Sequence, residues 1–368
     1  MPKPKYTAIS LFSGLGGDTL GLKNAGCKVI AYNELNPLFC DSHDKNFPDA
    51  ERIEHNGTLD ITNIPDSVFE NYKNKVDIIF AGFPCQGFSA AGKKLDDDPR
   101  NTLFREFLRS AKIVEPSMII GENVKGLLSR KTTSGEKYID VIVREFEALG
   151  YNVQYQVMKA DDFGVPQKRE RLIILGTKQN PKKKRAWATK EPSFPEPLLS
   201  NPNLKQIVKY DMSNTLKVDD SLFSEIPDEC ILTNMEDTQE YEPNNGAHPY
   251  LVMKNNASGS GLTYKDKEFD NLFSFGKRIS PIHCEIVDIR QPTKTIICSY
   301  DHQPRFFVPL KNASGCYLRV LLPDELKQIQ GFPADYKVCG SVKEQIVQIG
   351  NAVPPPLIKK IVEQVITP

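Results

Sequence analysis

The stretch TAISLFSGLGGDTLGLKNAGCKVIAYNE, residues 7–34, contains the pattern that decides the fold. Its first six residues, 7–12, are apolar and β-branched and predict a strand, and 18–26 predicts a helix that ends at Gly26. The segment 28–34 predicts a second strand. A strand, a glycine-rich turn, a helix and another strand form the repeating unit of α/β folds.

The same alternation continues through the first half of the chain. Apolar runs predict strands, and apolar side chains at helical spacing predict helices between them. The strands are expected at 76–82, 117–123, 152–158 and 171–177, and the helices at 102–116 and 136–150. This order predicts an α/β domain with a largely parallel sheet.

The pattern breaks after about residue 181. Residues 181–280 are rich in Pro, Asn, Asp, Lys and Ser and have few regular periods, which predicts a second, irregular domain or a large insertion. Helical signals return at 320–333 and in the proline-opened 354–366. We therefore expect one domain at 1–180, completed by 340–368, and a smaller domain at 181–339.

The composition excludes several classes of protein. Of the 368 residues, 39% are hydrophobic and 26% are charged, as in ordinary globular proteins. No apolar run predicts a membrane span or a signal peptide. The eight cysteines form no C-x-x-C pair, so no metal site is expected, and their scatter favours a reducing compartment. We expect a cytoplasmic protein, or a nuclear one in a eukaryote or virus.

The charges of the chain balance but are unevenly placed. Residues 219–242 contain nine acidic side chains and no Lys or Arg, whereas 178–190 contains six basic side chains and no acidic one. Binding to nucleic acid depends on where the charges lie, so a formal net charge of zero does not exclude it.

Three glycines, Gly14, Gly16 and Gly17, lie between the first strand and the first helix. Glycine there lets the backbone approach a ligand closely, although a plain tight turn has the same composition. The run is not G-x-G-x-x-G, because Thr19 stands at the last position. Glu34 ends the second strand, where an acidic residue can bind ribose hydroxyls. Together these residues indicate an adenosine-containing cofactor at the carboxyl edge of the sheet.

Reactive side chains lie at or beside the ends of three other predicted strands. Cys85, between Pro84 and a glutamine, stands on a rigid loop, although many buried cysteines are inert. Glu122 lies beside apolar residues that favour its protonated form, or else it belongs to a helix-capping network. Arg169 and Arg171 share one side of a strand start and suit a phosphate or a base oxygen, unless they are solvated charges.

Together these residues resemble the cytosine-C5 DNA methyltransferase family. The resemblance covers about 7–177 and 290–357 and rests on ten motifs in the family's order: LFSGLGG, Glu34, LDI (59–61), GFPCQGFS, RNTLF, ENV, QKRER, RQPTKTI, QIQGFP and GNAVPP. It implies an α/β, Rossmann-like sheet of the S-adenosylmethionine-dependent methyltransferases, with a second, smaller and irregular target-recognition domain.

The resemblance also implies the roles of the reactive residues. Cys85 would attack C6 of a cytosine, because C5 is too poor a nucleophile until C6 carries an adduct. Glu122 would bind N3 and the amino group of that base. Arg169 would contact its O2, and Arg171 would support this geometry. The base must leave the helix stack to reach Cys85, so base flipping is implied.

For the cofactor, the resemblance implies that Phe12 stacks on adenine and that Gly14, Gly16 and Gly17 lie along the methionine part. Glu34 would take the ribose hydroxyls and Asp60 the adenine amino group. Ile61, Pro84, Leu103 and Asn351 would complete the site, with Asn351 packing back against the cofactor domain. Ser10 departs from the family, which usually has Asp there to shape the cofactor turn.

The family reads DNA with the variable segment, here about 180–289. Its acidic part is unsuited to phosphates, so groove contacts are expected within 254–278. The residues expected to touch DNA are Lys254, Asn255, Asn256, Lys277 and Arg278, together with Gln86 and Ser89 beside Cys85.

We therefore expect a monomeric enzyme that methylates C5 of cytosine at a specific site in double-stranded DNA. Whether a cognate restriction endonuclease accompanies it stays open. A tRNA cytosine methyltransferase shares the scaffold but should carry Cys-Phe-Thr in the recognition segment, which this chain lacks. A non-catalytic relative should have lost Cys85, Glu122 or Arg169. A nicotinamide dehydrogenase would need the third glycine and a hydride-site histidine.

Overall fold

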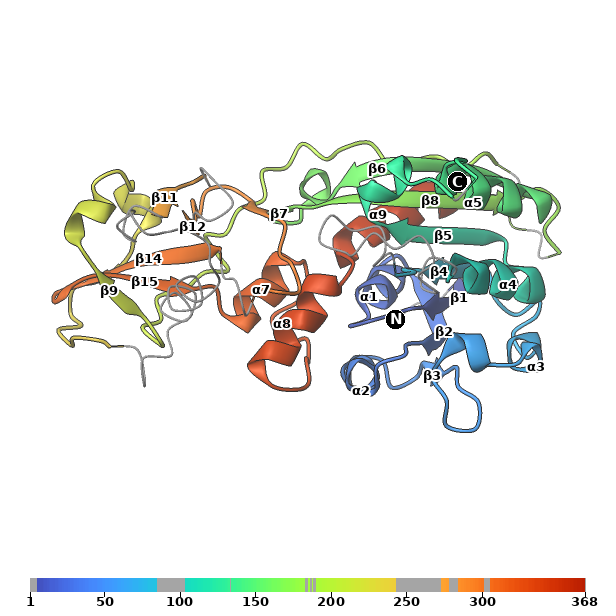
Figure 1. The fold of residues 1–368 in the computed structure, drawn as a ribbon, viewed down its shortest axis with the longest axis horizontal. Helices are drawn as coiled ribbons and strands as arrows, with labels where there is room; N and C mark the ends of the chain where they lie inside the picture. Colours follow the sequence, from blue (N-terminus) through green and yellow to red (C-terminus); the bar gives the residue numbers. More distant parts are fainter. Residues whose placement is uncertain are drawn as a thin grey trace.

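Figure 1 shows the computed structural model, which describes residues 5–84, 103–132, 134–182, 185, 187, 190–242, 273–277, 284–300 and 305–367. A first lobe surrounds a seven-stranded sheet, and a second lobe surrounds a smaller sheet. Between them lie α7 (Pro323–Ile329) and α8 (Val342–Asn351). The helices of the described residues include none that is long and apolar enough to span a membrane.

The first sheet has a parallel part and an antiparallel edge. Its strand order is β3 (Glu51–Arg52), β2 (Cys27–Asn33), β1 (Tyr6–Leu11), β4 (Ile78–Ala81), β5 (Met118–Asn123), β8 (Glu170–Lys178) and β6 (Tyr151–Lys159). The neighbours from β3 to β5 pair in parallel, whereas β8 is antiparallel to both β5 and β6. This arrangement confirms the predicted α/β fold, and the expected strands lie within two residues of those observed.

Helices cover both faces of this sheet. In β4, Ile78 and Phe80 belong to one hydrophobic cluster and Ile79 and Ala81 to the other, as the period of two residues in a strand requires. The helices of the first lobe are α1 (Gly17–Asn24), α2 (Pro37–Asn46), α3 (Asp66–Glu70), α4 (Phe104–Val114), α5 (Tyr138–Ala148) and α9 (Pro355–Ile366). The C-terminal α9 packs against α1, so the chain's end completes the first lobe.

The second lobe is built on short strands. Its strand order is β11 (Phe273–Phe275), β12 (Cys284–Ile286), β14 (Phe306–Asn312), β15 (Gly315–Val320) and β9 (Leu216–Val218), and β10 (Leu232–Asn234) also pairs with β14. The irregular character expected for this region holds for 190–215, which contains no helix or strand. The sheet itself is more regular than the sequence suggested, because β14 and β15 form a hairpin of buried residues.

The chain crosses the junction between the lobes near residue 293. There β13 (Thr293–Lys294) pairs in parallel with β7 (Gln167–Lys168), and Thr293 N donates to Pro166 O at 3.0 Å. After this contact with the first lobe, the chain returns to the second lobe as β14. The segment 293–300 is therefore a strap laid across the junction.

Candidate active site

Four parallel strands end at the same edge of the first sheet and place several of the predicted site residues there. Phe12 follows β1, Glu34 follows β2, Pro84 follows β4, and Glu122 lies at the end of β5. A Cβ on Gly82 would lie 3.7 Å from Phe12 O and 3.8 Å from Glu122 Oε2. The ends of β1, β4 and β5 thus meet where open α/β sheets bind their ligands.

Glu34 is held by two backbone amides. Gly14 N donates to its Oε2 at 2.8 Å, and Asn36 N donates to its Oε1 at 2.9 Å. Burial raises the pKa of the Glu34 carboxyl, against the lowering effect of these two donors. A carboxyl group fixed in this way beside the glycine turn can accept hydrogen bonds from the hydroxyls of a ribose.

The three glycines of the turn are required for different reasons. Gly14 has a φ of +55°, and a Cβ there would meet open space. A Cβ on Gly16 would lie 2.8 Å from the Phe47 ring, and one on Gly17 would lie 2.0 Å from Val353 O. Gly14 therefore borders the space expected for a ligand, whereas Gly16 and Gly17 make room for the chain itself.

Asp60 caps the short 3-10 turn Ile61–Asn63. Its Oδ1 accepts hydrogen bonds from Thr62 N at 3.0 Å and from Thr62 Oγ1 at 2.8 Å. Ile61 is buried in the core, so its side chain anchors this loop. Sequence analysis missed Asn33, whose Nδ2 donates to Leu59 O at 3.0 Å and ties the end of β2 to the Asp60 loop. Its only sequence signal was its place next to Glu34.

Ser10 contacts a carboxyl group that the sequence analysis had not considered. Its Oγ donates to Oδ2 of Asp18, and Ser13 Oγ lies 3.4 Å from the other oxygen. Asp18 is almost fully buried in the first turn of α1. Burial raises its pKa to about 7, against the lowering effect of the Ser10 hydrogen bond. Below the glycine turn, α1 therefore supplies an acidic group where β1 has only a hydroxyl.

Glu122 and Arg171 form an ion pair at the end of β5. Arg171 Nε lies 2.8 Å from Glu122 Oε1, and both side chains are mostly buried. Arg171 lies on β8, which pairs antiparallel with β5 and so brings the two residues together. The guanidinium orients the carboxyl group and offsets the cost of burying its charge.

Arg169 lies close by but makes different contacts. Its Nη1 donates to Ile296 O and its Nη2 donates to Gly350 O, each at 3.1 Å. Its Nε is buried and has no partner among the described residues, and the side chain is 2% exposed. The structure therefore joins Arg171 to Glu122, while Arg169 holds two segments that come from the C-terminal part of the chain.

Asn123 connects Glu122 to the loop that carries Cys85. Its Nδ2 donates to Phe83 O at 3.1 Å, and its Oδ1 accepts from Val124 N at 2.8 Å. This side chain fixes the backbone two residues before Cys85. The ENV motif contained Asn123, but sequence reasoning weighed it only as part of a capping network.

Several predicted residues lie outside the described part of the chain: Cys85, Gln86, Ser89, Lys254, Asn255, Asn256 and Arg278. Pro84 and Leu103, on either side of the first three, are half-buried. Lys277 is exposed just after β11 in the second lobe. Asn351 is exposed at the end of α8, so the packing against the first lobe is made by its neighbours, such as Val353 against Gly17.

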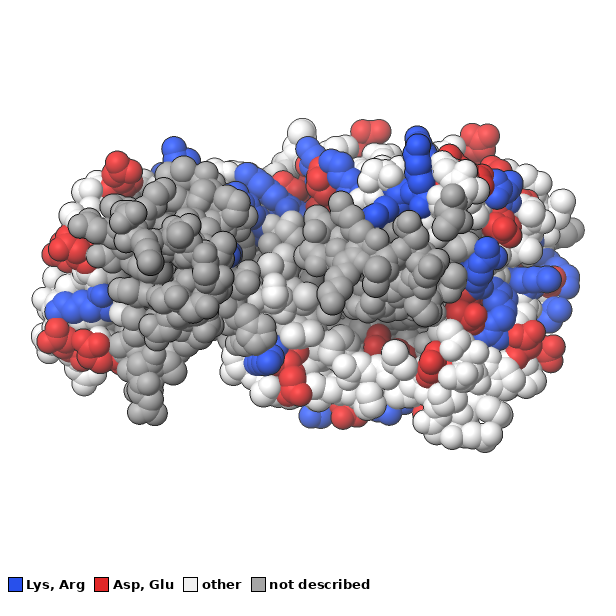
Figure 2. Space-filling model, in the orientation of Figure 1, with Lys and Arg blue, Asp and Glu red and all other residues white. Residues whose placement is uncertain are grey.

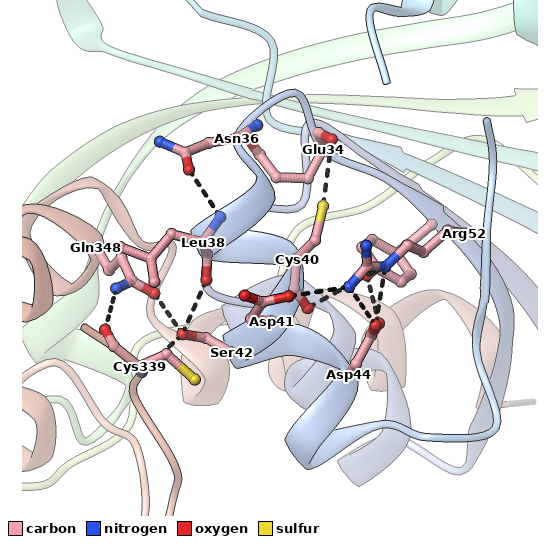
Figure 3. Close-up of polar contacts among 11 residues, drawn as sticks. Glu34, Asn36, Leu38, Cys40, Asp41, Ser42, Asp44, Arg52, Cys339 and Gln348 are labelled. Carbon is pink, nitrogen blue, oxygen red and sulfur yellow. Dashed lines mark hydrogen bonds and ion pairs between the residues drawn. The ribbon is translucent and has the colours of Figure 1, made fainter. Parts of the chain in front are cut away.

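Figure 3 shows that α2 contacts Arg52 of β3 and also the C-terminal segment. Ser42 Oγ donates to Gln348 Oε1 at 2.6 Å, and Gln348 Nε2 donates to Cys339 O at 2.7 Å. Cys339 N closes the triangle by donating to Ser42 Oγ at 2.9 Å. At the start of α2, Asn36 accepts a capping bond from Leu38 N. Through this cap and the bond from its N–H to Glu34, Asn36 holds the turn after Glu34 in place.

The charged side chains on the face drawn in Figure 2 do not form a field of one sign. Among the described residues, Lys and Arg are interleaved with Asp and Glu along the first lobe. The described residues also contain no group of three His, Cys, Asp or Glu side chains placed to hold a metal ion.

Comparison with known proteins gives one consistent result. A family model for C-5 cytosine-specific DNA methylase matches residues 6–367. The chain is 32% identical to the type II methyltransferase M1.HphI of Haemophilus parahaemolyticus, over 98% of this chain and 86% of that protein. It is also 32% identical to the type II methyltransferase M.PspPI of Psychrobacter sp. strain TA137, over 96% and 77% of the two chains.

Solved structures share the fold at lower identity. DNMT2 of Spodoptera frugiperda aligns with a TM-score of 0.60 and 19% identity, over 97% of this chain and 99% of that one. The methyltransferase EhMeth of Entamoeba histolytica aligns with a TM-score of 0.59 and 17% identity, over 98% and 97%. At this level of identity the likeness extends to the fold alone.

Proposed function

The chain belongs to the C-5 cytosine-specific DNA methylase family, and on this premise we propose that Cys85, Glu122 and Arg171 transfer a methyl group to C5 of a flipped cytosine. The enzyme is a DNA (cytosine-5)-methyltransferase with S-adenosylmethionine as methyl donor. The observation that carries the residue assignment is the Glu122–Arg171 ion pair of 2.8 Å. It lies beside β4, the strand that leads directly into Pro84 and Cys85.

The ends of β1 and β2 fit the cofactor. Glu34 is fixed to accept the ribose hydroxyls, and Gly14 borders open space where a backbone can approach the ligand. Phe12 follows β1, and Asp60 caps the turn that Asn33 ties to the end of β2, so we propose that both contact the adenine. When bound, S-adenosylmethionine supplies an electrophilic methyl group.

At the base, the Cys85 thiolate adds to C6 and makes C5 electron-rich. Glu122 binds the amino group and gives a proton to N3, so that the ring does not become an anion. C5 would take the methyl group that the bound cofactor supplies. A base such as water then removes the hydrogen at C5 as a proton, Cys85 leaves C6 as a thiolate, and N3 returns its proton to Glu122. Arg171 keeps the Glu122 carboxyl oriented and stabilises its charge after the proton has left.

The second lobe is proposed to read the DNA. We propose the division into a first domain at 1–180 and 340–368 and a recognition domain at 181–339. Because its relatives M1.HphI and M.PspPI are named type II methyltransferases, we propose that this monomeric enzyme modifies a specific double-stranded site within a restriction–modification system.

The test is methyl transfer from tritiated S-adenosylmethionine to plasmid DNA, with the sites mapped by bisulfite sequencing and with tRNA as a competing substrate. Cys85→Ser should lose nearly all transfer and keep cofactor binding, and Cys339→Ser serves as the matched control. DNA with 5-fluorocytosine should trap the wild type, because fluorine cannot leave as H⁺ does. Full activity of Cys85→Ser, or no gel-stable adduct, would end the nucleophile assignment, and transfer to tRNA alone would end the DNA proposal.

A further inference from the structure

A chain of hydrogen bonds runs through two buried glutamines at the junction of the lobes. Ile296 N donates to Gln167 Oε1 at 2.9 Å. Gln167 Nε2 donates to Gln330 Oε1, and Gln330 Nε2 donates to Ala352 O. Both glutamines are fully buried. The chain thus connects the strap at 293–300 with the turn between α8 and α9.

The direction of this chain is fixed at both ends. A backbone N–H such as that of Ile296 can only donate, and a carbonyl such as that of Ala352 can only accept. Each glutamine must therefore accept on one side and donate on the other, as an amide does. A carboxylate lacks the donor and a leucine lacks both groups. Either change leaves buried polar groups without partners, which is costly.

Arg169 links the same two segments a second time. It donates to Ile296 O and to Gly350 O, so Ile296 is held through both its N–H and its carbonyl. Gln167 and Arg169 are two residues apart and reach the same partner residue. The backbone at 297–298 also packs closely against Gly350, where a Cβ would lie 2.5 Å from Cys298 N. We call this set of contacts the junction clamp.

The junction clamp touches each functional part of the molecule. The strap at 293–300 lies between β12 and β14 of the second lobe. The turn at 350–353 places Val353 O against Gly17 in the glycine turn. Arg171, two residues after Arg169, carries the ion pair with Glu122. A shift in the clamp would therefore move the recognition lobe relative to both the cofactor turn and the catalytic pair.

We propose that Gln167 and Gln330 are positioning residues that set the recognition lobe in one geometry relative to Glu122 and Arg171. Apolar side chains could fill the same space, but they would not specify one arrangement, whereas a directional amide chain does. The inference rests on the methyl transfer proposed above. Its consequence is kinetic, because a small misplacement of bound DNA slows the chemical step more than it weakens binding.

The first test is single-turnover methyl transfer by Gln330→Leu and Gln167→Leu at saturating DNA and cofactor. We expect the rate to fall on the order of tenfold or more, while the Kd values for DNA and S-adenosylmethionine stay within about twofold. The double variant should be no slower than the slower single variant, because either change breaks the same chain.

The pH dependence of the Gln330→Glu rate tests the hydrogen-bond chain itself, because a side chain that only fills space would not make the rate depend on pH. In this variant the new carboxyl group can donate to Ala352 O again when it is protonated, but not when it is ionised. Burial raises the pKa of such a carboxyl. The rate of Gln330→Glu divided by that of the wild type should therefore rise as pH falls. The same ratio for Gln330→Leu should stay flat.

Gln348→Leu is the matched control. Gln348 is also fully buried and also uses both ends of its amide, but it joins α2 to Cys339. The Gln348→Leu variant should lower Tm as Gln330→Leu does, but it should keep the single-turnover rate of the wild type. Equal rate losses in the two variants, or a flat ratio for Gln330→Glu, would overturn the inference. If the wild type transfers no methyl group, the proposed function fails as well. If the wild type is active and only the variants behave in these ways, this inference alone fails.

Discussion

The charge of Asp18 is poorly compatible with its surroundings. Its carboxyl is buried beneath the glycine turn, and its pKa is raised from 3.8 to about 7 by burial. The folded state therefore holds this proton more tightly than the unfolded chain does. The contribution of Asp18 to stability is most favourable below pH 4 and declines as pH rises to about 7, by up to about 4 kcal/mol.

Asp18→Asn should remove this decline. Relative to the wild type, the variant should gain stability between pH 4 and pH 8, measured as the free energy of unfolding in urea. Ser10→Ala should show the opposite trend, because the Ser10 hydrogen bond lowers the Asp18 pKa. If the free energies of unfolding of Asp18→Asn and the wild type differ by the same amount at every pH, the raised pKa of Asp18 is contradicted.

Other residues show which roles a sequence can and cannot reveal. The positions of Glu34 and Glu122 were predictable, because each ends an apolar strand at the edge of the sheet where α/β folds bind ligands. The need for glycine at position 17 was not predictable, since a Cβ there would clash with the carbonyl oxygen of Val353, more than 300 residues away. The different partners of Arg169 and Arg171 were hidden as well, because alternation in a strand places both on one side without showing what each side chain reaches.

Among the elements, those of the first lobe follow from local pattern. β6 alternates apolar and polar residues, β8 contains a buried apolar run, and α5 is amphipathic, so each carries a local pattern that decides its type. The second lobe was harder, because β9, β10, β11 and β12 have three residues each. A strand of that length has no readable period and exists through pairing with β14 or β15, directly or through a neighbour.

The packing of α1 on α9 gives a prediction at this scale. A Cβ on Gly21 would lie 2.6 Å from Ile358 Cβ and 2.8 Å from Pro355 O. Gly21→Ala should destabilise the protein by about 1–3 kcal/mol through overpacking, although alanine favours a helix by about 1 kcal/mol. The measurement is urea unfolding, with Asn24→Ala on the exposed side of α1 as the control. A stabilised Gly21→Ala would show that α9 can move away from α1 at little cost.

At the scale of the whole molecule, we propose that the two lobes divide chemistry from recognition. The residues proposed for the cofactor and for catalysis lie in the first lobe, and the junction clamp joins the lobes, which leaves 180–289 as the segment proposed to read sequence. The formal net charge is zero, and charges of both signs are interleaved on the face drawn in Figure 2. With a net charge of zero, we expect attraction to DNA to come from local contacts rather than from the field of the whole protein.

These local contacts can be separated into two kinds by their response to salt and sequence. Lys277 is exposed beside β11, and if it contacts a phosphate, Lys277→Ala should weaken binding to all duplexes alike and reduce the salt slope by about 1. Lys217, which pairs with Glu240 in the same lobe, is the control and should change neither quantity.

Asn256, which lies outside the described residues, is expected instead to read a base, because an amide can pair with adenine in the major groove. Asn256→Ala should change preference at one position of the methylated site, at a cost of about 1–3 kcal/mol for a good contact. Methylation mapped across a genome measures this preference for each variant in 254–278. If all of them keep the wild-type preference while a change outside 180–289 alters it, recognition lies elsewhere, because phosphate contacts set register and carry no sequence information.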